Sequence, residues 1–287
     1  MHILMRREKA SLRVSRRATR ILAALCLVLA CASAAQAESW WQTHVNSIGM
    51  EFVLISPGSF FLEHEVTDGQ GTPRRPKVTI SKAFYLGKYP VTQEQWEAVI
   101  GSNPSLFKGR SRPVENVSWR DAQEFIRRLG ALEQHERYRL PTEMEWEHAA
   151  RGGTDSKYFF MEDPRTWEEA EIPLDAYAWF NKNSQGNTRP VGMKKPNPYG
   201  LYDMYGNVWE WVQDRFVVTL PNVLELRDYT GPAPSPWNDR ERVFRGGSFG
   251  LSGAYSRSGS RRSLTPDYRH NDIGFRLALS PEEIIER

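Results

Sequence analysis

The sequence predicts a single α+β domain that is rich in structured loops and poor in regular secondary structure. Strand-like segments come first, three segments with helix-start signals follow, and Gly, Pro, Asn and aromatic residues then dominate from about residue 153 to about residue 240. All ten tryptophans follow residue 39, and their buried area suits a loop-rich domain. A chain of 287 residues fits one large domain.

The strand predictions rest on three apolar segments. "MEFVLISPGSFFLEHE" predicts a β-hairpin, with Pro57 and Gly58 at its turn. In "KVTISKAFYLGKYPVT", apolar residues alternate from Val78 to Ile80 and recur at Phe84, which is typical of strands. "DIGFRLAL" predicts a closing strand near the end of the chain.

Three helices are predicted from their N-terminal caps. Each begins at Ser or Thr and has a polar partner three residues later, the pattern of a capping box. The pairs are Thr92 with Gln95, Ser118 with Asp121, and Thr142 with Glu145. Gly152 predicts the end of the third helix. The second helix has an apolar stripe that predicts core packing, formed by Ala122, Phe125, Ile126, Leu129 and Leu132.

Acidic residues crowd the start of the third helix. Glu143, Glu145 and Glu147 lie within its first two turns, where the helix dipole favours negative charge. We therefore interpret them as capping and dipole residues rather than as an acid–base site.

Residues 1–37 have the features of a secretory signal peptide. A basic stretch precedes the apolar run "ILAALCLVLACASAA", and "AQA" forms a cleavage site that ends at Ala37. We expect export to the periplasm or beyond, with a mature domain of residues 38–287. An uncleaved anchor is one alternative. Cleavage before Cys31, in the lipobox-like "VLAC", would instead leave a lipid-anchored protein, and "SRR" from Ser15 leaves twin-arginine export open.

Removal of the signal changes the charge and the cysteine content. The first 37 residues hold seven basic residues and one acid, a charge of +6 against +3 for the whole chain, so the rest carries about −3. We therefore expect no nucleic-acid partner, and a membrane partner only if Cys31 is lipidated. Cys26 and Cys31 are the only cysteines, so the mature domain has no disulfide, no thiolate nucleophile and no cysteine-ligated metal.

The segment "YGLYDMYGNVWEW" predicts a calcium site. Asp203, Asn207 and Glu210 bring oxygen-bearing side chains to a tight turn at Gly206, and Ca²⁺ prefers such hard oxygen ligands. The alternative is a polar turn buried by the neighbouring tryptophans. The six histidines show no metal-ligand spacing.

The segment "RVFRGGSFGLSGAYSRSGSRRS", residues 242–263, predicts an anion-binding surface. It is rich in Arg, Ser and Gly and contains no Cys, His, Asp or Glu. Arginine favours carboxylate ligands, although some of these arginines could simply pair with acids of the protein itself.

Six motifs in order resemble the formylglycine-generating enzyme family, also called the sulfatase-modifying factor family, over residues 44–280. They are "YLGKYPVTQEQWEAVIG", "RPVENVSWRDAQEFIRRL", "RYRLPTEMEWEHAARGG", "PVGMKKPNPYGLYDMYGNVWEW", "RVFRGGSF" and "GFRLAL". The resemblance implies a compact fold like that of C-type lectins. It also implies calcium bound by the side chains of Asp203 and Glu210 and the backbone carbonyls of Gly206 and Val208.

The chain departs from the family where the family's copper chemistry resides. Formylglycine-generating enzymes hold Cu(I) with two cysteines that follow the GGS motif, and the matching positions here are Leu251 and Ser256. Soft Cu(I) requires thiolate ligands, so copper is not expected.

The resemblance implies a pocket floored by arginine and serine, with a tryptophan wall. Its expected residues are Arg245, Ser248, Arg257 and Trp209. We expect a maturation factor or oxidoreductase-like protein that acts on a peptide or protein in the cell envelope without the copper–cysteine route. The alternative is a non-catalytic module that binds a peptide or carboxylate. Some branches of the family without the cysteine pair resemble a pyoverdine-maturation protein, and others resemble lectin-like binding modules.

Overall fold

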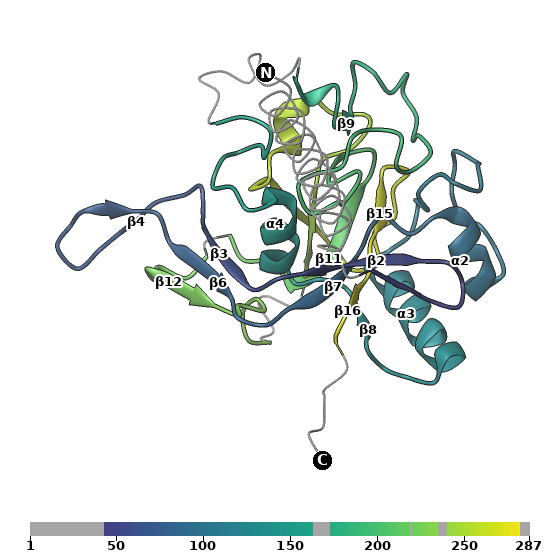
Figure 1. Cartoon of the computed structure of the whole chain (residues 1–287), viewed down its shortest axis with the longest axis horizontal. Coiled ribbons are helices and arrows are strands. Elements are labelled where there is room, and N and C mark those ends of the chain that lie inside the picture. The colour runs from purple at the N-terminus through teal and green to yellow at the C-terminus, as the bar shows by residue number, and fades with distance from the viewer. Residues whose placement is uncertain (1–42, 163–172, 219, 235–239, 282–287) are drawn as a thin grey trace, which may run out of the picture. The chain divides into compact units, whose positions relative to one another are not determined.

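The computed structural model of the protein describes residues 43–162, 173–218, 220–234 and 240–281 (Figure 1). These residues belong to one compact unit that begins at Thr43. The predicted signal peptide, including Cys31, lies outside the described residues. No helix within the described ranges is long and apolar enough to cross a bilayer.

One sheet joins the two ends of the described chain. Its five strands lie in the order β1-β2-β7-β16-β8, and every neighbouring pair is antiparallel. The bounds are β1 Thr43–Val45, β2 Glu51–Ile55, β7 Phe84–Gly87, β16 Ala278–Leu279 and β8 Tyr138–Arg139. β16, near the end of the described chain, thus lies between β7 and β8, which come much earlier in the sequence. The sheet therefore depends on long-range contacts.

A second sheet carries most of the expected site segments. Its strand order is β14-β13-β11-β15, antiparallel except for the parallel pair β11 and β15. The bounds are β14 Arg261–Leu264, β13 Arg242–Arg245, β11 Trp209–Arg215 and β15 Ile273–Phe275. The GNVWEW segment, the GGS segment and the GFR segment are therefore brought side by side.

Smaller sheets complete the strands. A three-stranded sheet has the order β12-β6-β3, and two further pairs are β4 with β5 and β9 with β10. The bounds are β12 Glu225–Arg227, β6 Lys77–Ile80, β3 Gly58–Phe61, β4 Val66–Thr67, β5 Pro73–Arg74, β9 Ala178–Trp179 and β10 Tyr205–Gly206. Between residues 153 and 240, the described residues form three strands of two or three residues, β9, β10 and β12, and the seven-residue strand β11, with loops between them.

The predicted hairpin around Pro57 is wrong. Its two strands form, as β2 and β3, but they pair with different partners: β2 with β1 and β7, and β3 with β6. Partners on both sides make β2 a central strand. The predicted closing strand is likewise two strands, β15 and β16, which belong to different sheets. Arg276 separates them, and its side chain binds buried groups.

The three helices begin where their caps predict. They are α2 Gln93–Ile100, α3 Trp119–Glu133 and α4 Glu143–Arg151, and each has both hydrogen bonds of a capping box. Gly152 ends α4 in a left-handed conformation with φ 56°, which glycine adopts without steric cost. A 3₁₀ helix, η2, spans Gly253–Ser256.

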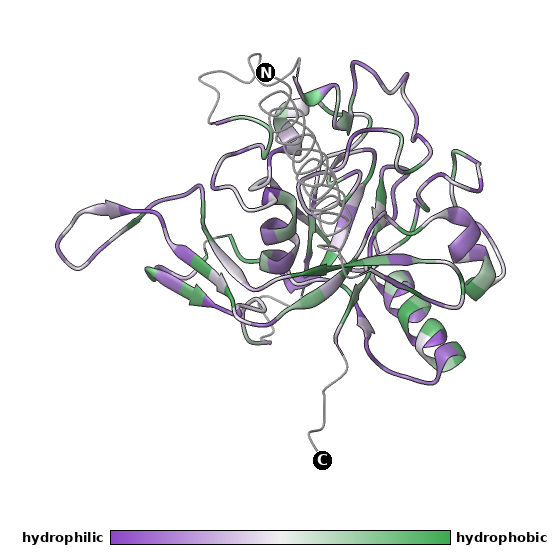
Figure 2. Cartoon of the chain, in the orientation of Figure 1, coloured by the Kyte–Doolittle hydropathy of each residue, from purple (hydrophilic) through white to green (hydrophobic). Residues whose placement is uncertain are grey.

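The apolar faces of the helices pack into two core clusters. The first surrounds Trp146 of α4, which lies beside β3, β6, β11 and β13. The second joins Trp96 of α2 to Phe125 of α3 by a stacked ring contact of 5.4 Å. Figure 2 shows the apolar run along β2 and the amphipathic alternation on α3. Leu132 is an exception to the predicted stripe, because it is 59% exposed.

Candidate functional site

A serine, an aspartate and a histidine meet beside the second sheet. Ser248, which follows β13, donates a hydrogen bond of 2.9 Å to Oδ2 of Asp272. The other carboxylate oxygen of Asp272 lies 2.5 Å from Nδ1 of His270. Ser248 is fully buried, whereas the side chains of Asp272 and His270 are 16% and 50% exposed. Asp272 therefore connects a buried hydroxyl to an imidazole at the surface.

Trp209 links this polar group to an exposed cation. Its amide donates a hydrogen bond of 2.8 Å to the carbonyl of Asp272, and the guanidinium of Arg262 lies 5.8 Å from its ring centroid. The same guanidinium group lies 4.6 Å from the ring centroid of Tyr255. Stacked guanidinium groups keep their N–H donors at the edge of the plane. Arg262 is exposed and can direct those donors towards a ligand.

Exposed aromatic rings extend this surface. Tyr255 and Tyr268 are both exposed, and the ring of Tyr268 stacks on His270 with an interplanar angle of 15°. Amphipathic rings at a surface provide contact area at low entropy cost. We call the group formed by Tyr255, Arg262, Tyr268, His270 and Asp272 the aromatic–cationic ledge.

A buried carboxyl group lies on a loop that is hydrogen-bonded to the ledge. Oε1 of Glu115 accepts a hydrogen bond of 2.8 Å from the amide of Phe107, whereas Oε2 has no hydrogen-bond partner among the described residues. Burial raises the pKa of Glu115 to about 7, and the charge of Asp272 acts in the same direction. The carbonyl of His270 accepts a hydrogen bond of 2.9 Å from the amide of Asn116, so the Glu115 loop and the ledge are connected.

The predicted pocket residues separate into two groups. Trp209 and Ser248 both contact Asp272, so the structure brings them together. Arg245 is fully buried and paired with Glu147. Arg257 forms an ion pair of 3.0 Å with Glu63. Burial and internal partners give Arg245 a structural position, which corrects the expectation that it floors a pocket.

Neither position of the family's cysteine pair carries a metal ligand. Leu251 packs against the second core cluster. Ser256 is buried, and its hydroxyl has no partner among the described residues. Gly247, with φ 79°, approaches so closely that a Cβ there would lie 2.4 Å from the Ser256 hydroxyl. The segment keeps a tight backbone around Ser256 without the thiolates that Cu(I) requires.

The predicted calcium turn fits a cation only in part. Arg276 donates two hydrogen bonds of 2.7 Å to the carboxylate of Glu210, and Trp146 adds a third of 2.6 Å. Glu210 is therefore already neutralised. The carboxylate of Asp203 accepts bonds of 2.8 Å from the amide of Gly192 and 3.3 Å from the side chain of Asn207.

Asp203 is the uncompensated carboxylate of this turn. Burial raises its pKa to about 6, although the Gly192 amide and the Arg276 charge oppose the change. A bound cation would favour the ionised form of the Asp203 carboxyl group. Gly206 and Val208, whose carbonyls were expected as ligands, are both buried. No group of three or more His, Cys, Asp or Glu side chains in the described ranges could hold a metal ion, so calcium remains a proposal.

Sequence reasoning missed Asp272 and Glu115, and gave no role to Tyr255 and Tyr268. The available signal was the segment "TPDYRHNDIGF", in which aromatic and polar side chains alternate directly before a buried strand. A residue that immediately precedes a strand lies in a loop at the end of that strand, and binding residues commonly occur in such loops.

Comparison with known proteins identifies the family. A model described as the sulfatase-modifying factor enzyme 1-like domain matches residues 40–281. The chaperone protein LppX of Paenibacillus barcinonensis is 32% identical over 213 residues, which cover 58% of this chain and 72% of that protein. The formylglycine-generating enzyme of Thermomonospora curvata is 34% identical over 219 residues, which cover 74% of this chain and 69% of that enzyme.

Two further relatives are one protein that is named as inactive and one that is named as an enzyme. The inactive Cα-formylglycine-generating enzyme 2 of Bos taurus is 30% identical over 231 residues, which cover 77% of this chain and 66% of that protein. The formylglycine-generating enzyme of Mus musculus is 34% identical over 197 residues, which cover 66% of this chain but only 50% of the mouse enzyme. The chain thus spans about half the length of some curated relatives that it matches.

Solved structures agree with the predicted fold class. Treponema denticola variable protein 1 has a TM-score of 0.69 and 33% identity, and the match covers 84% of this chain and 99% of that one. PvdO from Pseudomonas aeruginosa has a TM-score of 0.64 and 24% identity, with 84% and 98% covered, and shows the fold alone. The predicted single, loop-rich α+β domain is confirmed. From the matched motifs, the family model and these relatives together, the chain belongs to the formylglycine-generating enzyme, or sulfatase-modifying factor, family.

Proposed function

We propose that this protein is an exported maturation factor that recognises a peptide or protein segment in the cell envelope through the aromatic–cationic ledge. The observation that carries this proposal is that Arg262 contacts the rings of both Tyr255 and Trp209, and that Trp209 in turn binds the carbonyl of Asp272, whose side chain pairs with His270. One surface thereby offers hydrogen-bond donors, a carboxylate–imidazole pair and exposed aromatic area, a combination suited to an extended peptide.

Recognition is proposed without the family's copper chemistry. Leu251 and Ser256 occupy the positions of the copper ligands, and no cysteine follows Cys31 in the sequence. The names of two relatives, a chaperone protein and an inactive Cα-formylglycine-generating enzyme 2, are consistent with members of the family that do not make formylglycine. Redox chemistry on a bound segment would require a redox group other than a cysteine.

The second candidate is binding without turnover. It is favoured by the full burial of Ser248, because a buried hydroxyl that already donates to Asp272 is poorly placed to attack a substrate. In this reading the Asp272–His270 pair recognises the ligand rather than transferring a proton. Both candidates use the same ledge and differ in whether the bound segment is chemically changed.

The proposal is tested by selection and measurement of peptide ligands. Displayed peptides are selected on the mature protein, and their affinities are measured by isothermal titration calorimetry. Arg262→Ala is expected to weaken binding about tenfold, the loss typical of one charge-assisted contact. Arg74→Ala is the matched control, since Arg74 is exposed, pairs with Asp68 and lies on β5, which contributes no residue to the ledge.

Equal affinities for the two variants, or no selectable peptide, would overturn the ledge as the binding surface. Mass spectrometry of the recovered peptides separates the two candidate functions. A changed mass supports maturation chemistry, whereas an unchanged mass supports binding alone.

A further inference from the structure

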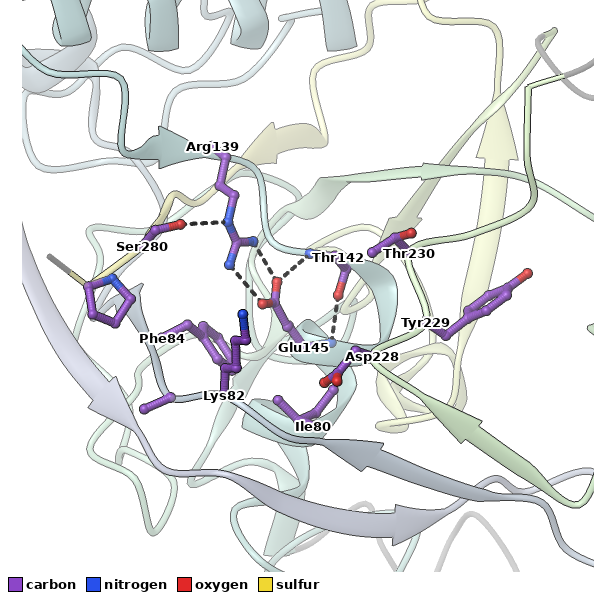
Figure 3. Close-up of a pocket in the computed structure, with 12 residues that line it drawn as sticks. Ile80, Lys82, Phe84, Arg139, Thr142, Glu145, Asp228, Tyr229, Thr230 and Ser280 are labelled. Atoms are coloured by element: carbon purple, nitrogen blue, oxygen red, sulfur yellow. Dashed lines mark hydrogen bonds and ion pairs between the residues drawn. The ribbon is translucent and has the colours of Figure 1, made fainter. Parts of the chain in front are cut away.

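A pocket lies where several helices and strands begin or end. Its volume is about 530 Å³, and it shares no residue with the ledge. It is bordered by the end of β6, the start of β7, the end of β8, the start of α4 and the segments after β12 and β16. Figure 3 shows its residues arranged around the Arg139–Glu145 pair.

The carboxylates of this pocket are already satisfied by the protein. Glu145 accepts bonds of 2.6 and 2.7 Å from Arg139 and another of 2.8 Å from the amide of Thr142. Asp228 accepts bonds of 2.7 Å and 2.5 Å from the amide and the hydroxyl of Ser81. These contacts lower the pKa of Asp228, the Ser81 hydroxyl bond being the largest cause. Neither carboxylate is therefore available as a strong acceptor for a ligand.

The cations of the pocket, in contrast, retain donors. Lys82 is exposed, and Figure 3 draws no hydrogen bond or ion pair from its ammonium group to the other residues shown. Arg139 is 31% exposed. Its two terminal nitrogens already donate to Glu145 and to the carbonyl of Leu140, but its Nε donates only a long bond of 3.4 Å to the hydroxyl of Ser280. An ammonium group carries three donors and no acceptor. The unused hydrogen-bonding capacity of the pocket is thus mainly of the donor type.

Apolar side chains line the same pocket. Ile80 and Phe84 lie at its β6–β7 side (Figure 3). Pro281, two residues after the end of β16, also lines the pocket. Hydroxyl groups of Thr142, Thr230 and Ser280 supplement the cations. A ligand that matches these walls would carry one negatively charged acceptor group next to a short apolar group.

We propose that this pocket binds a carboxylate attached to a small apolar group. Two sources share that chemistry: a free branched-chain carboxylic acid, and the C-terminal residue of a peptide. The carboxylate would lie between Lys82 and Arg139, and the apolar group would lie against Phe84. The proposal does not depend on the function assigned to the ledge.

Binding of three defined compounds to the mature protein tests this assignment. The compounds are 3-methylbutanoate, N-acetyl-leucine and N-acetyl-leucinamide, titrated to concentrations on the order of millimolar by NMR or calorimetry. N-acetyl-leucine mimics a peptide C-terminus, and its amide lacks the charge. We expect the carboxylates to bind and the amide to bind at least about tenfold more weakly.

Matched lysine variants localise the site. Lys82→Gln should weaken carboxylate binding about tenfold, whereas Lys77→Gln, an exposed position on β6 that does not line the pocket, should leave it unchanged. Both substitutions are at exposed positions, and unchanged melting temperatures verify folding. Preference for N-acetyl-leucine assigns the site to peptide C-termini, and preference for 3-methylbutanoate assigns it to free acids. Equal binding of acid and amide, no binding, or equal effects of the two variants would overturn the proposal.

Discussion

Arg245 and Glu147 form an ion pair in the interior of the domain, with side chains only 1% and 3% exposed. Glu147 also accepts a bond of 2.6 Å from Arg151. Arg245 further donates to the carbonyls of Ser258, Gly259 and Ser260 at 2.9 to 3.1 Å. Burial works to raise the pKa of Glu147, but the two guanidinium groups outweigh it and hold that pKa below its ordinary value. The ion pair joins α4 to β13, and the carbonyl bonds of Arg245 join β13 to the segment before β14.

Removal of Arg245 is expected to destabilise the fold severely. Arg245→Ala should lower the free energy of unfolding by about 3–5 kcal/mol, because it leaves Glu147 buried with one partner fewer. Urea denaturation measures the change. Arg257→Ala, which breaks a partly exposed pair with Glu63, should cost only about 0–1 kcal/mol. Similar losses for the two variants would contradict the structural position assigned to Arg245.

Asp214 is expected to make stability depend on pH. Burial raises its pKa from 3.8 to about 8, and Glu143 adds to the effect. The folded protein therefore keeps a proton that the unfolded chain releases above pH 3.8. The contribution of this group is full below that pH and is lost as the pH rises to about 8, with a slope of about 1.4 kcal/mol per pH unit.

The variant Asp214→Asn isolates this contribution. Denaturation at pH 5 and pH 8 should show a smaller decrease in stability for Asp214→Asn than for the wild type. Asp267→Asn, at an exposed position, should keep the wild-type decrease. A wild type and an Asp214→Asn variant with the same pH dependence would refute the raised pKa.

Calcium is expected to stabilise the turn that contains Asp203. A cation that binds only the folded state raises stability by mass action, and Asp203 is the carboxylate of this turn that has no cationic side chain in direct contact among the described residues. Addition of a chelator should lower the melting temperature of the wild type and not that of Asp203→Asn. Asp175→Asn, at an exposed position, should retain the response. An unchanged melting temperature of the wild type would argue against calcium.

Formylglycine production from a cysteine peptide with Cu(I) and O₂ is expected to be absent. Neither a leucine nor a serine side chain provides a soft ligand. Aldehyde is assayed on the mature protein, and Cu(I) affinity is measured by competition with a chelating dye. The double substitution Leu251→Cys with Ser256→Cys should create Cu(I) binding. Multiple-turnover aldehyde formation by the wild type would disprove this prediction.

The mature N-terminus is expected at Glu38. Cleavage after the "AQA" sequence would expose it, and intact-mass spectrometry of protein from the expressing cell identifies it. A lipidated Cys31 in the membrane fraction would replace this expectation with the anchored form.

Local signals in the sequence were sufficient for the helices but not for the strand pairs. A capping box is complete within four residues, so Thr92, Ser118 and Thr142 could be identified without tertiary information. Strand pairing depends on partners far away in sequence. Nothing near Pro57 indicated that β2 would pair with β7 and β3 with β6.

The charged residues of α4 show the same limit. The sequence identified Glu145 as a capping residue, and its side chain does accept the amide of Thr142. It could not show that Glu143 and Glu147 pair with Arg261 and Arg245, each about a hundred residues away. Arginines that looked like a ligand-binding surface are in part the counter-ions of this helix.

The sequence by itself determined the family, the single α+β domain, the three helix starts and the loss of the copper ligands, because these depend on residue identity and short-range spacing. Only the tertiary structure decided which polar residues face a ligand. Burial assigned Arg245 and Glu210 to internal ion pairs. The strand order β14-β13-β11-β15 placed Trp209 of β11 where its ring contacts Arg262 of β14 and its amide binds the carbonyl of Asp272 before β15. A charged side chain can bind a ligand only if the fold has not already paired it with another residue, and the pairing residues come from distant parts of the chain.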